Sequence, residues 1–274
     1  MFRNKRIHPR TFTACFAVLI TLYSFKPDMS GPWIKTPGKQ VTLFSRPSMY
    51  SGTESPDSQT IRKIIREQEE VIILINNKLG TSFREKVSLY LFNFDEAKEK
   101  IGTNGGGSCN SGRKEIYFTF YSNPIFNTVR NSYEYVGVHE MVHIVANNEL
   151  GELRSAFFAE GYSNAIDGNY GAVKEGDHLV RRRIELTVNN LRKNGIFHTP
   201  TELLMNDQLP AREFYPEIGW LMNWLFNTYG IEKMNLLYAT GRKKTIEKFA
   251  LVTGDTFSEM EKKYLESQKS SGVY

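Results

Sequence analysis

His139-Glu140-Met141-Val142-His143 places two histidines four positions apart, with a glutamate directly after the first. On an α-helix, residues i and i+4 lie one turn apart on the same face, so both imidazoles can reach one metal ion. Glu140 then lies at the flank of that ion, where its carboxylate can take a proton from bound water. This stretch predicts a helix with two ligands of a zinc site, which needs a third protein ligand from elsewhere in the chain.

Two carboxylates compete for the third position. Glu160 lies on the next expected helix, residues 152–167, and two antiparallel helices joined by a short loop would return it to the histidines. Glu149 is the rival, because metalloproteases also use a ligand at that spacing where a glycine turns the chain sharply. Ala146 stands at the glycine position and resists the required backbone angle. We therefore favour Glu160 over Glu149.

The expected Glu160 helix also carries Asn164 and Asp167 at i+4 and i+7 on the same face. These groups could bond the distal nitrogens of the histidine ligands and fix their orientation. A solvent-exposed polar stripe is the alternative interpretation.

The residues before the motif have mostly strand character. Strands are expected at 40–45, 87–94 and 114–121, and a helix is expected at 58–79, where apolar residues recur at helical spacing until Gly80. Residues 102–112 read as a glycine and asparagine loop. The strand at 87–94 is almost continuously apolar, which is typical of an inner strand.

The motif helix is expected to run from Ser132 to about Asn147, with Asn131 as its N-cap and Glu134 as the capping partner. After Gly151 only helical patterns are visible, at residues 152–167, 177–194, 214–229, 231–239 and 257–267. The fold class expected is α+β, with an N-terminal β-sheet lobe that includes the motif helix, about 40–150, and a C-terminal all-helical lobe, about 151–274.

The first 25 residues look like an export signal or a signal anchor. Four basic residues precede an uncharged stretch, 11–25, which is shorter than the roughly 20 residues that span a bilayer comfortably. Residues 26–39 contain several prolines and glycines and read as an extended linker, so a single domain is expected over 40–274. The protein is expected to be exported, either periplasmic, extracellular or anchored in the membrane facing outward.

Most of the net positive charge of the chain lies in these first 25 residues, the leader. Of 35 basic residues, four lie within 1–25, which leaves 31 against 30 acidic residues in the rest of the chain. The body is therefore nearly neutral, and nucleic acid is excluded as an expected partner. Cys15 lies in the leader, where lipidation is a minor alternative, and Cys109 reads as a half-buried inert thiol.

The motif followed by Ala159-Glu160-Gly161 resembles the gluzincin zinc metallopeptidases, in particular small exported "peptidase MA-like" members. The stretches 89–95 and 215–225 are also similar to elements around the gluzincin site, although less specifically. The resemblance implies a zincin-like fold in which His139, His143 and Glu160 hold Zn²⁺ and Glu140 is the general base. The motif that binds the substrate's terminal amine in large aminopeptidases is not found.

The resemblance implies hydrolysis of peptide bonds by Glu-assisted attack of zinc-bound water, with a peptide or protein as substrate. A donor must also stabilise the oxyanion. Tyr215 is the favoured candidate, with Tyr162, His178 and His198 as alternatives. The strand 115–121 could orient an extended substrate by backbone pairing, or it could be an ordinary edge strand. The alternative function is an inactive exported binding protein on a peptidase-like scaffold.

Overall fold

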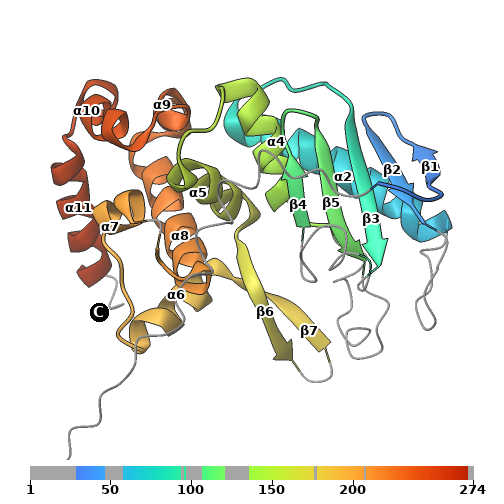
Figure 1. The fold of residues 1–274 in the computed structure, drawn as a ribbon. Coiled ribbons are helices and arrows are strands. Elements are labelled where there is room, and N and C mark those ends of the chain that lie inside the picture. Colours follow the sequence, from blue (N-terminus) through green and yellow to red (C-terminus); the bar gives the residue numbers. More distant parts are fainter. Residues whose placement is uncertain are drawn as a thin grey trace, which may run out of the picture.

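The computed structural model describes residues 29–46, 58–93, 96, 107–120, 136–175, 178–206 and 208–270. A mixed β-sheet forms one half of this part, and a mainly helical half follows it in the chain (Figure 1). The coarse class expected from the sequence, α+β with the sheet first, is confirmed. The sheet has the order β1-β2-β3-β5-β4, with β1 Ile34–Pro37, β2 Val41–Ser45, β3 Val87–Asn93, β4 Gly107–Asn110 and β5 Glu115–Phe120.

The centre of the sheet is parallel and its two edges are antiparallel. Parallel neighbours need a crossover connection, which α2, Ser58–Leu79, supplies between β2 and β3. The bounds of α2 match the sequence prediction, and Gly80 follows it with a φ of +66°. One side of α2 packs into the core through its regularly spaced isoleucines, Ile61, Ile64, Ile65, Ile72 and Ile75.

Two strands lie where the sequence predicted a linker and a loop. β1 lies within 26–39, which was expected to be a linker, and pairs antiparallel with β2 through a turn in which Gly38 N donates to Val41 O at 2.8 Å. β4 lies within the loop expected at 102–112 and pairs with β5. Its residues are Gly, Ser, Cys and Asn, which have little strand preference. Backbone pairing with a strong neighbouring strand therefore determines this conformation.

The motif helix α4 spans His139–Leu150, so it begins later and ends later than expected. Residues 136–138 are not helical, and Val138 at the N-cap makes no side-chain capping bond. The predicted cap, Asn131 with Glu134, lies outside the described residues. Buried Gln68 of α2 fixes the start of α4 instead, because its amide donates to the Gly137 carbonyl at 3.0 Å.

Seven helices of the described chain follow α4. The best-packed pair among them is α5 with α8, whose axes approach closely at Gly161 and Gly219. The bounds are α5 Ala156–Asp167, α6 Ile184–Lys193, α7 Pro200–Met205, α8 Ala211–Tyr229, α9 Ile231–Tyr238, α10 Arg242–Thr253 and α11 Phe257–Ser270.

The expectation of an all-helical C-terminal lobe is wrong. A β-hairpin of β6, Asn169–Glu175, and β7, His178–Arg183, lies between α5 and α6, where one helix over 177–194 was expected (Figure 1). Gly168, with a φ of +71°, ends α5, and Gly171 takes the same φ at an irregularity in the hairpin pairing. These two left-handed residues end the helix and direct the chain into the hairpin.

The expected export segment, 1–25, lies outside the described residues, as does Cys15. Among the helices that are described, none combines the length and the apolar character needed to cross a bilayer.

Candidate metal centre

Two antiparallel helices, α4 and α5, carry the three residues expected to bind metal. His139 and His143 lie one turn apart on α4, and Glu160 lies on α5. The connection is short and tied at both ends, since Asn147 Oδ1 accepts from Leu153 N at 2.9 Å and Ser155 Oγ caps α5 at Phe157 N. This connection returns Glu160 to the histidines.

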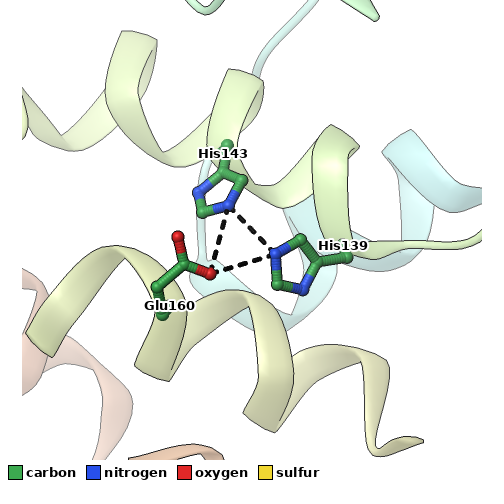
Figure 2. Close-up of side chains that lie close together, drawn as sticks. All are labelled: His139, His143 and Glu160. Carbon is green, nitrogen blue, oxygen red and sulfur yellow. Dashed lines mark hydrogen bonds and ion pairs between the residues drawn. The ribbon is translucent and has the colours of Figure 1, made fainter. Parts of the chain in front are cut away.

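Figure 2 shows the two imidazoles and the carboxylate turned toward one another. His139 Nε2 lies 3.1 Å from His143 Nε2 and 3.1 Å from Glu160 Oε2, and His143 Nε2 lies 3.7 Å from the same oxygen. Potential ligand atoms of these three residues all lie within 4.8 Å of one another. Among the described residues, this is the one His, Cys, Asp and Glu group able to hold a metal ion.

These separations fit a tetrahedral ion. Nitrogen and oxygen ligands lie about 2.0–2.2 Å from zinc, so neighbouring ligands of a tetrahedral site are about 3.3 Å apart. Glu160 is only 8 % exposed, and its Oε2 accepts no well-formed hydrogen bond from any residue that the structure describes. A buried carboxylate oxygen that faces two imidazole nitrogens can share a cation with them.

Glu149, the alternative third ligand, is placed elsewhere. It is exposed at the far end of α4, and its Oε2 accepts a hydrogen bond from Ser82 N at 3.2 Å. Ala146 is helical and buried, so α4 continues through the position where a sharp turn would have been required. The structure brings Glu160, and not Glu149, to the two histidines.

The contacts around the ligands differ from the expected ones. Ser163 Oγ lies 3.2 Å from Nδ1 of His143, the nitrogen remote from the proposed metal position. Asn164 is buried, but its amide donates to the Glu160 carbonyl at 2.8 Å, and Asp167 forms a bidentate ion pair with Arg181. These two residues are neither an exposed stripe nor hydrogen-bond partners of the imidazoles. Ser163, at i+3 from Glu160, was missed.

Burial and mutual contact shift the pKa values of all three residues. Burial alone would lower the pKa of His139, but contact with the Glu160 carboxylate outweighs it and raises that pKa to about 9. Burial lowers the pKa of His143. Burial would raise the pKa of Glu160, yet the two imidazoles hold it below its ordinary value. A metal ion would therefore replace a proton in this group.

Glu140 lies between the histidines and the edge strand β4. A Cβ atom added to Gly107 would meet Glu140 Cγ at 2.9 Å, so only glycine lets the strand approach the glutamate this closely. Ser111, directly after β4, ties the strand end to α4 by donating to the His143 carbonyl at 3.2 Å. Cys109 of β4 is partly exposed, and burial, followed by the charge of Glu140, raises the pKa of its thiol.

Tyr215, the favoured donor, lies in the first turns of α8 beside the metal centre. Its ring meets the His139 ring edge-on, with centroids 6.4 Å apart, and stacks on Tyr170 at 6.0 Å. The charge of Glu160, then burial and the charge of Glu140 raise the pKa of Tyr215, so its phenol keeps the proton. Tyr170, from the unexpected hairpin, was missed by the sequence analysis.

The other candidate donors do not join this group. Tyr162 is fully buried, and its hydroxyl donates to Asn235 Oδ1 at 3.1 Å. His198 is half-buried, with Nε2 3.3 Å from Glu213 Oε2. The backbone of His178 begins β7, and its side chain lies outside what the structure describes.

No family model matches this sequence, and no curated protein is similar enough to match it. The geometry of the site therefore carries the functional argument.

Proposed function

We propose that the chain is an exported zinc-dependent metallopeptidase with a gluzincin-like site. The observation that carries the proposal is the convergence of His139 Nε2, His143 Nε2 and Glu160 Oε2 at separations that fit one tetrahedral ion. Three protein ligands leave one position for water or substrate, which is typical of a catalytic zinc rather than a structural one. The sheet before α4 and the return of α5 also agree with the zincin-like fold implied by the resemblance.

His139, His143 and Glu160 would hold the zinc, which would supply Lewis acidity and would lower the pKa of a bound water to about 7. Glu140 follows His139 directly and lies against β4, so its carboxylate is placed at the edge of the site, where it can accept and later return a proton. Tyr215 keeps its phenolic proton and can donate a hydrogen bond to the oxygen on which negative charge develops. These are two different roles, a base and a donor.

The edge strand β4 is the surface that can orient a peptide. β5 was expected to have this role, but it pairs with β3 on one side and β4 on the other, which leaves the outer edge of the described sheet to β4. An extended substrate can pair with that edge through backbone hydrogen bonds, which tolerate many side chains. Close contact between Gly107 and Glu140 would bring the bound backbone near the base.

The test compares two glutamates of the same helix. Purified wild-type protein should carry about one zinc per chain and hydrolyse unfolded protein or a quenched peptide library. Glu140→Gln should keep zinc and lose at least about a hundredfold in hydrolysis, because the base is removed. Glu149→Gln makes the same chemical change at the exposed end of α4 and should keep full activity. Full activity in Glu140→Gln, or zinc-loaded wild type that cleaves nothing, would contradict the proposal and favour a binding protein.

A further inference from the structure

The turn of α8 that carries Tyr215 lacks part of its own hydrogen bonding. The N-cap is Pro210, which makes no side-chain capping bond. Pro216 lies inside the helix and has no N–H, so the Arg212 carbonyl loses the partner that an ordinary helix would provide. Backbone bonds to the Pro210 carbonyl close the first turn, but without a side-chain cap and with an internal proline this end of α8 gains stability from contacts outside the helix.

Tyr170 of β6 provides such support at two points. Its ring stacks on Tyr215, with centroids 6.0 Å apart and an angle of 30° between the ring planes. Its hydroxyl donates to the carbonyl of Ala211, the first residue of α8, at 3.2 Å. One side chain therefore contacts both the start of the helix and the ring that lies beside His139.

The hairpin that carries Tyr170 is tied to α6, through Tyr170 itself, and to α5, the helix that carries Glu160. The Tyr170 carbonyl accepts a hydrogen bond from Thr187 Oγ1 at 3.3 Å. The base of the hairpin is joined to the end of α5 by the bidentate pair of Arg181 with Asp167, whose bonds are 3.0 and 2.9 Å long. The hairpin thus links the ligand helix α5 to the first turns of α8.

We propose that Tyr170 is a positioning residue that holds the phenol of Tyr215 beside the metal centre. This inference rests on the proposed function in assigning Tyr215 a role in the reaction, but the contacts of Tyr170 with Ala211 and Tyr215 involve none of the proposed metal ligands. The β6–β7 hairpin is then a second connection between the ligand helix α5 and the first turns of α8, beside the direct packing of the two helices.

The first experiment measures this holding contact in metal-free protein. Amide hydrogen exchange over residues 211–218 should become at least about tenfold faster in Tyr170→Ala, whereas Tyr170→Phe, which keeps the stack, should show a smaller increase. Tyr229→Phe is the matched control. Tyr229 is also half-buried and hydrogen-bonded, to Asp255, but it lies at the opposite end of α8, about 21 Å along the helix from Tyr215. Unchanged exchange in Tyr170→Ala would overturn the proposal.

The second experiment tests whether Tyr170 acts through Tyr215. Tyr170→Ala should lower kcat about tenfold at constant KM and zinc content, and it should cause no further loss in a Tyr215→Phe background. Equal losses in both backgrounds would show that Tyr170 acts independently and would overturn the proposal. A wild-type protein that binds zinc but hydrolyses nothing would contradict the proposed function instead, and the exchange measurement would still decide whether Tyr170 holds the α8 turn.

Discussion

Two buried glutamates on neighbouring helices have opposite electrostatic surroundings. Glu160 of α5 is 8 % exposed and Glu217 of α8 is 1 % exposed. Burial raises the pKa of Glu217 to about 8, and the charge of Arg192 lowers it only in part. Burial would also raise the pKa of Glu160, yet His143 and His139 hold it below the ordinary value.

The difference lies in the partners of each carboxylate. Glu217 Oε2 accepts a hydrogen bond from the backbone N–H of His198 at 2.9 Å, while Oε1 has no hydrogen-bond partner in the described chain. Glu160 faces two imidazoles whose nitrogens have the spacing of metal ligands. Burial alone therefore does not make a cation site. A second and third ligand at the right distance distinguish Glu160 from Glu217.

The largest effect expected from this comparison is on metal affinity. Glu160→Ala removes one of the three proposed ligands and should weaken zinc binding by more than about a hundredfold, beyond the loss usual for contacts outside the ligand set. Glu217→Gln, a change at the other buried glutamate, should leave zinc binding unchanged. Competition with a zinc-binding dye measures both variants. Unchanged affinity in Glu160→Ala would remove Glu160 from the ligand set and end the contrast between the two glutamates.

The next effect is the pH dependence of stability caused by Glu217. Its pKa is about 8 in the folded protein against an ordinary value of 4.5, so the folded state keeps a proton that the unfolded state loses between these pH values. Stability of the wild type should therefore fall as pH rises from about 4.5 to 8. Glu217→Gln removes this titration and should be more stable than wild type by a few kcal/mol at pH 8, with little difference at pH 4. Urea unfolding at the two pH values measures it, and a difference independent of pH would contradict the assignment.

The sequence predicted the grouping of His139, His143 and Glu160 better than it predicted the strands and the hairpin around it. His139 and His143 need only helical spacing, and Glu160 needs only a second helix that returns, so both features follow from local pattern. The same is true of α2, whose apolar spacing and terminal Gly80 mark both ends. These features depend on residues close together in the chain.

The features that were missed depend on distant partners. β4 has little strand preference and exists because β5 pairs with it. The β6–β7 hairpin contains many charged residues, and the sequence of β7 was taken as part of a helix, although Gly168 and the Gly176-Asp177 pair were available as turn signals. Because the hairpin was not predicted, the contact between Tyr170 and Tyr215 was not predicted either, since it depends on tertiary structure.

A smaller effect, on the free energy of unfolding, is expected where α5, which carries Glu160, packs against α8, which carries Glu217. A Cβ at Gly219 of α8 would lie 2.6 Å from Asn164 Cβ and 3.2 Å from the Asn164 backbone, neither of which can move freely. A Cβ at Gly161 of α5 would lie 2.8 Å from Met222 Cε, the end of a flexible side chain. Gly219→Ala should therefore destabilise the protein by about 2 kcal/mol in urea unfolding, whereas Gly161→Ala should be nearly neutral. Equal effects would show that the two sides of this contact are equally adaptable.

The smallest expected effect is on zinc affinity and comes from Ser163, which lies on the same helix as Glu160 and contacts His143. If His143 binds a metal through Nε2, the proton is on Nδ1, and this N–H can donate a hydrogen bond to Ser163 Oγ, 3.2 Å away. Ser163→Ala should lower zinc affinity about tenfold, because the imidazole loses the contact that fixes its orientation. Ser267→Ala is the control, since Ser267 donates to a backbone carbonyl on α11 and its loss should not change zinc binding. If both serine variants bound zinc like the wild type, α4 alone would orient His143, and Glu160 would be the essential contribution of α5.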